Sequence, residues 1–532
     1  MPTLNWLGKE KVITHDRDVP YHSLKRKYSF DETGQHAEDN GSENMIIHGD
    51  NLLALKALLP TYEGRVKCIY IDPPYNTGEE NWVYNDNVND PRIKKWLGQV
   101  VGKEGEDFSR HDKWLCMMYP RIKLLWRLLS ETGFFFVSID DDEVRYLRLL
   151  CDEIFGRNNF IRSIVWQKRT SPDARLNLGD AHEYILVYAK NYAIAKPLLH
   201  KIPLSADRVT NYKNPDNDPR GVWASTDITG QVGHATDSQF YEITLPSGRR
   251  IKPPKNRCWA LAETTFQALR DDNRIWFGSS GDNQPRQKKF LFESEGGNVW
   301  SWWPKSEVGC YQESKKELIG LVGEGSADIF ETPKPLRLIE RVLEIASEPD
   351  SIILDAFAGA ATTAHAVLAL NKRDNGDRKF ICVELMDYAD TITAERAKRA
   401  ITGYGEGKKA VPGTGGNFSF YELGDPIVTE EGFDSELQSE EINAFLWETE
   451  TRTPYSAPED GSDGFLGIKD GIAVYAFHDG EEFAPFDRGK VRKMSHKAEG
   501  YVVYANSCMF TDEELAAMNV TFKKVPRDVK QR

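Results

Sequence analysis

The sequence has little of what marks a secreted, metal-binding or membrane protein. Its seven cysteines stand singly along 532 residues, with no C-x-x-C pair and no histidine at ligand spacing, so neither disulfides nor a metal site is expected. No basic segment followed by an apolar core opens the chain, which argues against secretion. The apolar stretch 351–370 contains Asp355 and His365 in its interior and therefore suits a buried strand and helix. We expect a cytoplasmic protein without membrane contact.

Acidic residues outnumber basic ones in the chain as a whole, but not in one region. The net charge is −14, and residues 422–470 account for most of it with 14 acidic residues against two basic ones. Residues 191–300 instead carry 15 basic residues against 12 acidic ones. A basic surface confined to one region is compatible with DNA binding, although such charge runs are more often plain solvated surface.

The order of apolar runs and helical stretches predicts the domain organisation. Apolar runs such as 66–71, 134–139 and 380–383 alternate with helical patterns, which is typical of a doubly wound, parallel α/β sheet. Between 191 and 330 this alternation stops and Pro, Gly, Asn and Trp become frequent. We predict an arm at 1–40, halves of one α/β domain at 41–190 and 331–415, an insert at 191–330, and a small C-terminal α+β domain at 416–532.

The segment Asp72-Pro73-Pro74-Tyr75 directly follows the apolar run 66–71. A simple strand-ending turn would explain it, but the residue types also suit one reaction. An aromatic amine is a poor nucleophile because its lone pair is delocalised into the ring. The Asp72 carboxylate and the Pro73 carbonyl can each accept one N–H, which directs the lone pair at a methyl donor, while Pro74 fixes the backbone and Tyr75 stacks on the base.

Three further acids stand at expected strand ends. The first is Asp355, in a segment (354–363) that predicts a strand, a turn of small residues and a helix start. Such a turn lets a cofactor approach the backbone, although a generic βα corner explains the pattern equally well. Glu384 ends the next expected strand, where a ribose diol is usually held. Asp50 follows an earlier strand, and alone it is more often a helix N-cap than a ligand. No G-x-G-x-x-G opens a helix, which disfavours a dinucleotide dehydrogenase.

Together, Asp72-Pro73-Pro74-Tyr75 and Asp355-x-Phe357-x-Gly359 resemble the motifs of DNA amino-methyltransferases. The catalytic motif precedes the cofactor motif, which is the circularly permuted order of their beta class. Longer strings at 47–55, 70–78, 138–141 and 182–188 resemble the modification (Mod) subunits of type III restriction-modification systems. The resemblance spans about 41–400 and implies a Rossmann-like methyltransferase fold that uses S-adenosyl-L-methionine (SAM), with a target-recognition domain at 191–330.

The resemblance also implies roles for single residues. Asp355, Phe357 and Gly359 would line the SAM pocket, Glu384 would take the ribose hydroxyls, and Asp50 the adenine amino group of SAM. Lys334, in Thr332-Pro333-Lys334-Pro335, would lie at the methionine end of SAM. His182 and Tyr184 would lie beside the flipped base, although a tyrosine in a strand belongs to the hydrophobic core at least as often. The usual second glycine of the cofactor turn is Ala361 here, and we expect it in the first helical turn, where alanine costs little.

The sequence thus predicts methyl transfer from SAM to N6 of an adenine flipped out of duplex DNA. Alternatives are cytosine N4 methylation and a SAM-binding DNA-recognition subunit without turnover. The expected partners are duplex DNA, a second copy of the chain and a restriction (helicase-nuclease) subunit. The expected DNA contacts in the insert are Arg249, Arg250 and Lys252, with Arg286, Lys288 and Lys289 as the next candidates.

Overall fold

The computed structural model describes residues 4–76, 110–171, 177, 179–204, 206–323, 325–326, 330, 332–428, 432–434, 437–453, 455–458, 464–479 and 482–530. The chain divides into two compact units, one formed by Met1–His200 with Trp300–Arg532 and the other by Lys201–Val299. Thr77 and Gly78, which end one of the family-like strings, lie outside the described residues. No described helix is long and apolar enough to cross a membrane.

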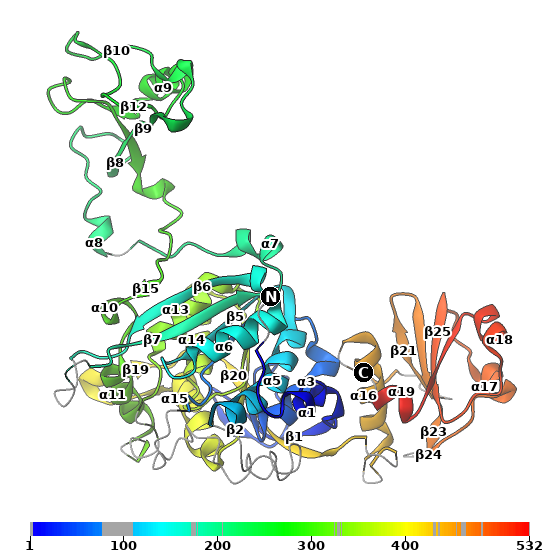
Figure 1. Ribbon diagram of the computed structural model, residues 1–532. Coiled ribbons are helices and arrows are strands. Elements are labelled where there is room, and N and C mark those ends of the chain that lie inside the picture. Colours follow the sequence, from blue (N-terminus) through cyan, green and yellow to red (C-terminus); the bar gives the residue numbers. More distant parts are fainter. Residues whose placement is uncertain are drawn as a thin grey trace. The chain divides into compact units, whose positions relative to one another are not determined.

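The first unit is built on a sheet of eleven described strands in the order β15-β6-β7-β5-β4-β16-β17-β3-β20-β1-β2. Figure 1 shows two of its neighbouring strands, β6 and β7, side by side. Their bounds are β1 His22–Asp31, β2 Gly34–His36, β3 Met45–His48, β4 Val66–Ile71, β5 Leu129–Ile139, β6 Phe160–Gln167, β7 His182–Ala189, β15 Trp302–Trp303, β16 Ile352–Asp355, β17 Lys379–Glu384 and β20 Asn417–Pro426. The six neighbours from β5 to β20 pair in parallel, and β7 joins β5 antiparallel.

Two groups of helices cover this sheet. The first group is α3 (Asn51–Tyr62), α5 (Arg110–Leu128) and α6 (Val144–Cys151), and the second is α11 (Tyr311–Val322), α13 (Leu336–Ala346), α14 (Thr362–Asp374) and α15 (Glu395–Thr402). Helix α3 of the first group and α14 of the second both contact the central strand β17. Strands buried between helices carry almost continuous apolar sequence, as β4 does. The expected doubly wound α/β fold is confirmed.

Acidic residues follow five neighbouring parallel strands at their carboxyl ends. Asp72 and Asp140 directly follow β4 and β5, Asp50 lies two residues beyond β3, and Asp355 and Glu384 are the last residues of β16 and β17. Because parallel strands all end at one edge of a sheet, the topology collects these acids at the edge where open α/β sheets bind ligands.

The two ends of the chain differ from the expected boundaries. The arm expected at 1–40 contributes β1 to the central sheet, where β1 pairs antiparallel with β20. Strand β20 in turn lies in the region assigned to the C-terminal domain. The sequence did not predict β1 or β20 as strands of the central sheet. Only part of each strand is buried, so polar and apolar residues are mixed along both. Beyond β20, the described elements are the four-stranded sheet β21-β22-β25-β26 (Phe465–Lys469, Ile472–Ala476, Gly500–Ala505, Val520–Lys524), the pair β23-β24 (His478–Asp479, Glu482–Phe483) and helices α16 to α19 (Ser439–Thr451, Arg488–Lys493, Asp512–Ala517, Arg527–Lys530).

The insert is the second compact unit and is shorter than the expected 191–330. It contains the three-stranded sheet β13-β14-β8 (Ile275–Trp276, Arg286–Phe290, Trp223–Asp227), the pair β9-β12 (Thr229–Gln231, Arg257–Trp259), the pair β10-β11 (Ile243–Thr244, Arg250–Ile251) and helix α9 (Glu263–Asp271). Trp259 and Phe266 lie in its own apolar core. Its two ends meet in an antiparallel bridge between Ile202 and Gly297. Residues 300–330 belong to the first unit.

One candidate DNA contact of the insert is buried. The side chain of Lys288 is 0% exposed, and its ammonium pairs with Asp218 at 3.1 Å and with Asp216. Because this ammonium is buried between two carboxylates, it cannot reach a phosphate, and removing either kind of partner would leave a buried charge unpaired. The structure therefore removes Lys288 from the candidates and leaves Arg286 and Lys289, which are exposed.

The expectation for Ala361 is wrong. Ala361 is the N-cap of α14 and has φ 56° and ψ 39°, a left-handed conformation that costs a residue with a Cβ roughly 1–2 kcal/mol. Gly359, two residues earlier, has φ 51°. The chain needs both left-handed residues to turn from β16 into α14, so this turn, rather than the first helical turn, holds Ala361.

We predict that Ala361→Gly raises the free energy of unfolding, by up to about 1 kcal/mol. The variant removes the left-handed strain, and only part of that gain is offset by the roughly 0.4–1 kcal/mol of extra entropy that glycine gives the unfolded chain. Urea unfolding of the full chain measures the change. The matched control is Ala360→Gly, which has no positive φ to relieve and should lower the free energy of unfolding. An equal loss of stability in both variants would contradict backbone strain at Ala361.

Candidate active site

The expected catalytic loop, residues 72–75, follows β4 and is held in place by Trp114 on α5 and by Glu143, the residue before α6. The indole Nε1 of Trp114, on α5, donates to the Pro74 carbonyl at 2.7 Å. Asn76 takes the left-handed conformation, with φ 60°, and its Nδ2 donates to the buried Glu143 at 2.6 Å. These contacts fix the loop from behind, so that Asp72 and Pro73 line a cavity at the carboxyl edge of the sheet.

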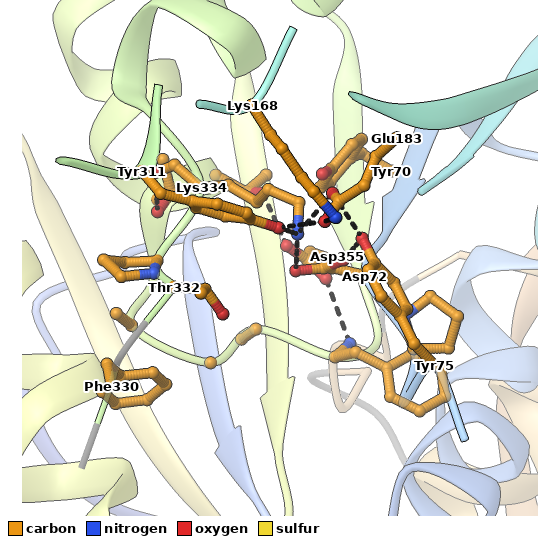
Figure 2. Close-up of a pocket in the computed structure, with 18 of the residues that line it drawn as sticks. Tyr70, Asp72, Tyr75, Lys168, Glu183, Tyr311, Phe330, Thr332, Lys334 and Asp355 are labelled. Carbon is orange, nitrogen blue, oxygen red and sulfur yellow. Dashed lines mark hydrogen bonds and ion pairs between the residues drawn. The ribbon is translucent and has the colours of Figure 1, made fainter. Parts of the chain in front are cut away.

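Five polar side chains in this cavity form a ring in which each lies within hydrogen-bond distance of the next (Figure 2). The Lys334 Nζ donates to Asp72 Oδ2 at 2.7 Å and to the Tyr311 hydroxyl at 3.1 Å. The Tyr311 hydroxyl donates to Glu183 Oε1 at 2.6 Å. The Tyr75 hydroxyl closes the ring, at 2.8 Å from Asp72 Oδ1 and 3.0 Å from Glu183 Oε2. The ring joins the catalytic loop to β7, to α11 and to the segment before α13.

Burial and charge act in opposite directions on Asp72. Desolvation raises the pKa of this carboxyl above its ordinary value, and the Lys334 ammonium offsets only part of that rise. Burial likewise raises the pKa of Tyr75 and Tyr311 well above the ordinary value, so both remain hydroxyl donors. The Lys334 Nζ also lies 5.0 Å from the centre of the Tyr75 ring. Lys334 is thus the positive charge that favours an ionised Asp72 in a buried cavity.

The expected cofactor loop forms the other wall of the same cavity. Asp355, at the end of β16, accepts from the Thr363 hydroxyl at 2.5 Å and from the Phe357 amide at 3.0 Å. Glu384, at the end of β17, accepts from the Gly359 amide at 2.8 Å and from the Met386 amide at 2.9 Å. Burial raises the pKa of Asp355 and of Glu384 to about 7.

The cavity has a volume of about 270 Å³. Its lining includes Asp72, Pro73, Tyr75, Lys334, Asp355, Phe357 and Gly359, all of which the sequence singled out. Small residues at 358–360 leave room for a ligand close to the backbone. No group of three or more His, Cys, Asp or Glu side chains within the described ranges could hold a metal ion.

Several residues expected at the site lie outside the cavity lining. Asp50 caps α3 by accepting from the Leu52 amide at 2.8 Å, and it pairs with the Arg121 guanidinium at 2.9 Å. Glu384 lies behind the cofactor loop and contacts it through the Gly359 amide. Tyr184 is hydrogen bonded to His182 at 3.1 Å, and because side chains alternate along β7, Glu183 points into the cavity instead. Of these residues, Asp50 makes the contacts of a helix N-cap, which is the common role of an acid that follows a strand.

The basic cluster of the insert lies at its surface. The side chains of Arg249 and Arg250 are 54% and 72% exposed, and their nearest carboxylates are Asp282 at 3.0 Å and Glu242 at 3.6 Å. Lys252 is exposed as well. Surface pairs of this kind contribute little to stability, so these cations remain accessible to an outside partner.

Sequence reasoning missed the two residues that complete the ring, Glu183 and Tyr311. Glu183 stands between His182 and Tyr184, and the alternation along a strand could have shown that it faces the other way. Tyr311 gave no such signal, because the region around it was assigned to the insert. Lys168, whose Nζ lies 2.5 Å from Asp180 and 3.4 Å from Glu183, also lines the cavity and was not expected.

Known proteins resemble the chain over most of its length. The Mod subunit of the type III restriction-modification enzyme StyLTI from Salmonella typhimurium is 38% identical over 70% of the chain and 55% of that protein. The EcoPI Mod subunit from Escherichia phage P1 is 32% identical over 72% of the chain and 63% of that protein. The chain therefore spans somewhat more than half the length of these relatives.

Comparison with solved structures and with protein families gives two further matches. A putative DNA modification methylase from Thermus thermophilus, solved with S-adenosyl-L-methionine, matches 71% of the chain and 99% of that protein at 15% identity and a TM-score of 0.31. The family described as DNA methylase matches residues 66–395, more than half of the chain, and includes both the catalytic loop and the cofactor loop. The chain belongs to this DNA methylase family.

Proposed function

We propose that the protein transfers a methyl group from SAM to N6 of adenine in duplex DNA. The observation that carries this proposal is the Lys334–Asp72 ion pair at 2.7 Å, which presents a carboxylate beside a cavity walled by the cofactor loop. An ionised Asp72 and the Pro73 carbonyl accept the two hydrogens of an exocyclic amine and direct its lone pair, while the Tyr75 ring offers a face to the base. No covalent intermediate with the protein is needed.

The polar groups in and beside the cavity suit SAM. Carboxylates at the ends of adjacent strands suit a nucleoside cofactor, and Glu384 would hold the ribose hydroxyls while Gly359 allows close approach. Asp355 and Phe357 would border the rest of the nucleoside, and Lys334 the methionine end. SAM supplies a methyl group already activated by a positively charged sulfur, so the protein has only to orient the amine and exclude water.

Adenine is favoured over cytosine because the catalytic loop begins with Asp72. In the related amino-methyltransferases aspartate at this position accompanies adenine, and serine accompanies cytosine. Methylation of cytosine N4 is the second candidate, since cytosine also presents an exocyclic amine. A subunit that binds SAM without turnover is disfavoured by the intact catalytic loop.

The names of the relatives suggest the biological setting. Both are Mod subunits of type III restriction-modification enzymes, and we place this chain in the same role, modifying a specific site so that a partner helicase-nuclease subunit does not cleave it. The chain would act in the cytoplasm as a homodimer on duplex DNA. The insert would read the target sequence, and its exposed cations would contact phosphates.

The direct test is to incubate the protein with SAM and duplex DNA and to identify the methylated nucleoside after digestion. We expect N6-methyladenine; N4-methylcytosine would favour the second candidate, and no methylation would refute the proposal.

Asp72→Ala should lower the single-turnover rate at least about 100-fold while SAM affinity changes little, because a preorganised contact to the amine is lost. Asp141→Asn, an exposed acid at the same edge, is the control. Equal loss of rate and SAM affinity in Asp72→Ala would make Asp72 a cofactor residue.

Glu384→Gln should weaken SAM binding at pH 8 by about 1–3 kcal/mol, since the ribose hydroxyls lose a charged acceptor. Burial raises the pKa of Glu384 to about 7, so the carboxyl is ionised at pH 8 and mostly protonated at pH 6. The variant and the native protein should therefore differ less at pH 6. Calorimetric titration with SAM at both pH values measures this, with the exposed Glu348→Gln as control. An unchanged affinity at pH 8 would remove Glu384 from the site.

Charge reversal at Arg249, Arg250 and Lys252 should weaken DNA binding for all sequences and flatten its salt dependence. Each lost phosphate contact lowers the slope of log affinity against log salt by about one. SAM affinity should not change, because the cofactor loop belongs to the other unit. The matched control reverses Arg488, Arg492 and Lys493, which are exposed on and around α17. An unaltered slope in the insert variant would move the DNA contacts elsewhere, with Arg286 and Lys289 as the next candidates.

A further inference from the structure

The Tyr75 hydroxyl lies between two carboxylates although it has only one proton to donate. Its oxygen is 2.8 Å from Asp72 Oδ1 and 3.0 Å from Glu183 Oε2. A hydroxyl hydrogen rotates about the C–O bond, so it can point at either oxygen while every heavy atom stays in place. The two acceptors are therefore alternatives for one donor.

Glu183 is built to serve as the second acceptor. Its side chain is 3% exposed, and its other oxygen is occupied by the Tyr311 hydroxyl at 2.6 Å and faced by the Lys168 ammonium at 3.4 Å. These contacts hold the carboxylate in place and compensate its charge. Asp72 is held on its other oxygen by Lys334. Each carboxylate thus keeps one oxygen fixed and turns the other towards Tyr75 (Figure 2).

The target amine needs the same oxygen that Tyr75 occupies. Under the proposed function, Asp72 must accept an N–H from the flipped base, while Lys334 holds Oδ2. If Tyr75 had no second acceptor, the hydroxyl and the amine would have to share the two lone pairs of Asp72 Oδ1, which weakens the hold of the carboxylate on the amine. With Glu183 in reach, the hydroxyl keeps a hydrogen bond throughout.

We propose that Glu183 is the alternative acceptor that lets the Tyr75 hydroxyl release Asp72 to the target amine. This inference rests on the proposed methyl transfer and adds a positioning residue to it. Before the base enters, the Tyr75 hydroxyl donates to Asp72. When the amine arrives, the hydroxyl turns to Glu183, and the Tyr75 ring keeps its place. No covalent bond forms or breaks in this step.

The test compares Glu183→Gln in two backgrounds, with Tyr75 and with Tyr75→Phe. An amide at 183 keeps an oxygen for Tyr311 but turns an N–H towards Tyr75, so the hydroxyl loses its second carboxylate acceptor and stays on Asp72. With Tyr75 present, Glu183→Gln should slow single-turnover methylation about 5- to 100-fold, the range for disturbing one buried hydrogen bond to a charged group. With Tyr75→Phe, which keeps the aromatic ring, the same change should cost less than about three-fold, as expected for two residues that act through one contact.

The control places Glu183→Gln in a Tyr311→Phe background. This removes the other hydroxyl that Glu183 holds, so the loss caused by Glu183→Gln should persist. Equal losses in all three backgrounds, or a rescue by Tyr311→Phe equal to that by Tyr75→Phe, would overturn the inference. A native protein that methylates no DNA would instead refute the proposed function, so the two failures can be told apart.

Binding gives a second measurement that does not depend on turnover. Duplexes with adenine or with purine at the methylated position differ only in the 6-amino group. The native protein should prefer adenine, Glu183→Gln should lose most of that preference, and adding Tyr75→Phe should restore it. The shorter Glu183→Asp, which withdraws the acceptor but keeps the charge, provides the same comparison if the amide variant does not fold. A preference that is unchanged in the Glu183 variants would overturn the inference.

Discussion

The ion pair between Lys334 and Asp72 is the contact on which the site depends. A buried carboxylate beside a second one, Glu183, is costly unless a cation compensates both, and Lys334 lies 2.7 Å from the first and 3.7 Å from the second. The two partners of the pair are 262 residues apart in the chain. The pair therefore also fastens together the two halves of a fold that the insert interrupts.

The cofactor loop also depends on a contact with a buried carboxylate. The loop turns from β16 to α14 through two left-handed residues, and the Gly359 amide donates to the Glu384 carboxylate at the end of the neighbouring strand. Glu384 thus shapes the wall of the cavity in addition to any contact with a ligand. The strain at Ala361 is stored next to this contact, as is common where a backbone must follow the outline of a ligand.

Much of the fold and part of the site could be predicted from the sequence because their signals are local. Continuous apolar runs identify the buried parallel strands, and an acid after such a run lies at the ligand-binding edge, which located Asp72, Asp355 and Glu384. The partly exposed β1 and β20 have no such run. Glu183 and Tyr311 come from β7 and α11, and nothing local joins them to Asp72. The φ of Ala361 depends on the angle between β16 and α14, and the residue types in the turn do not determine that angle.

The antiparallel bridge between Ile202 and Gly297 brings the two ends of the insert together. A segment that leaves and re-enters a fold at one point can be exchanged for another of different length at little cost, because the closure entropy of a long loop grows only slowly with its length. The insert also has an apolar core of its own, which includes Trp259 and Phe266. Under the proposed function, in which the insert reads the target sequence, recombination at this junction would change the sequence specificity in a single event and leave the methyl-transfer site as it is.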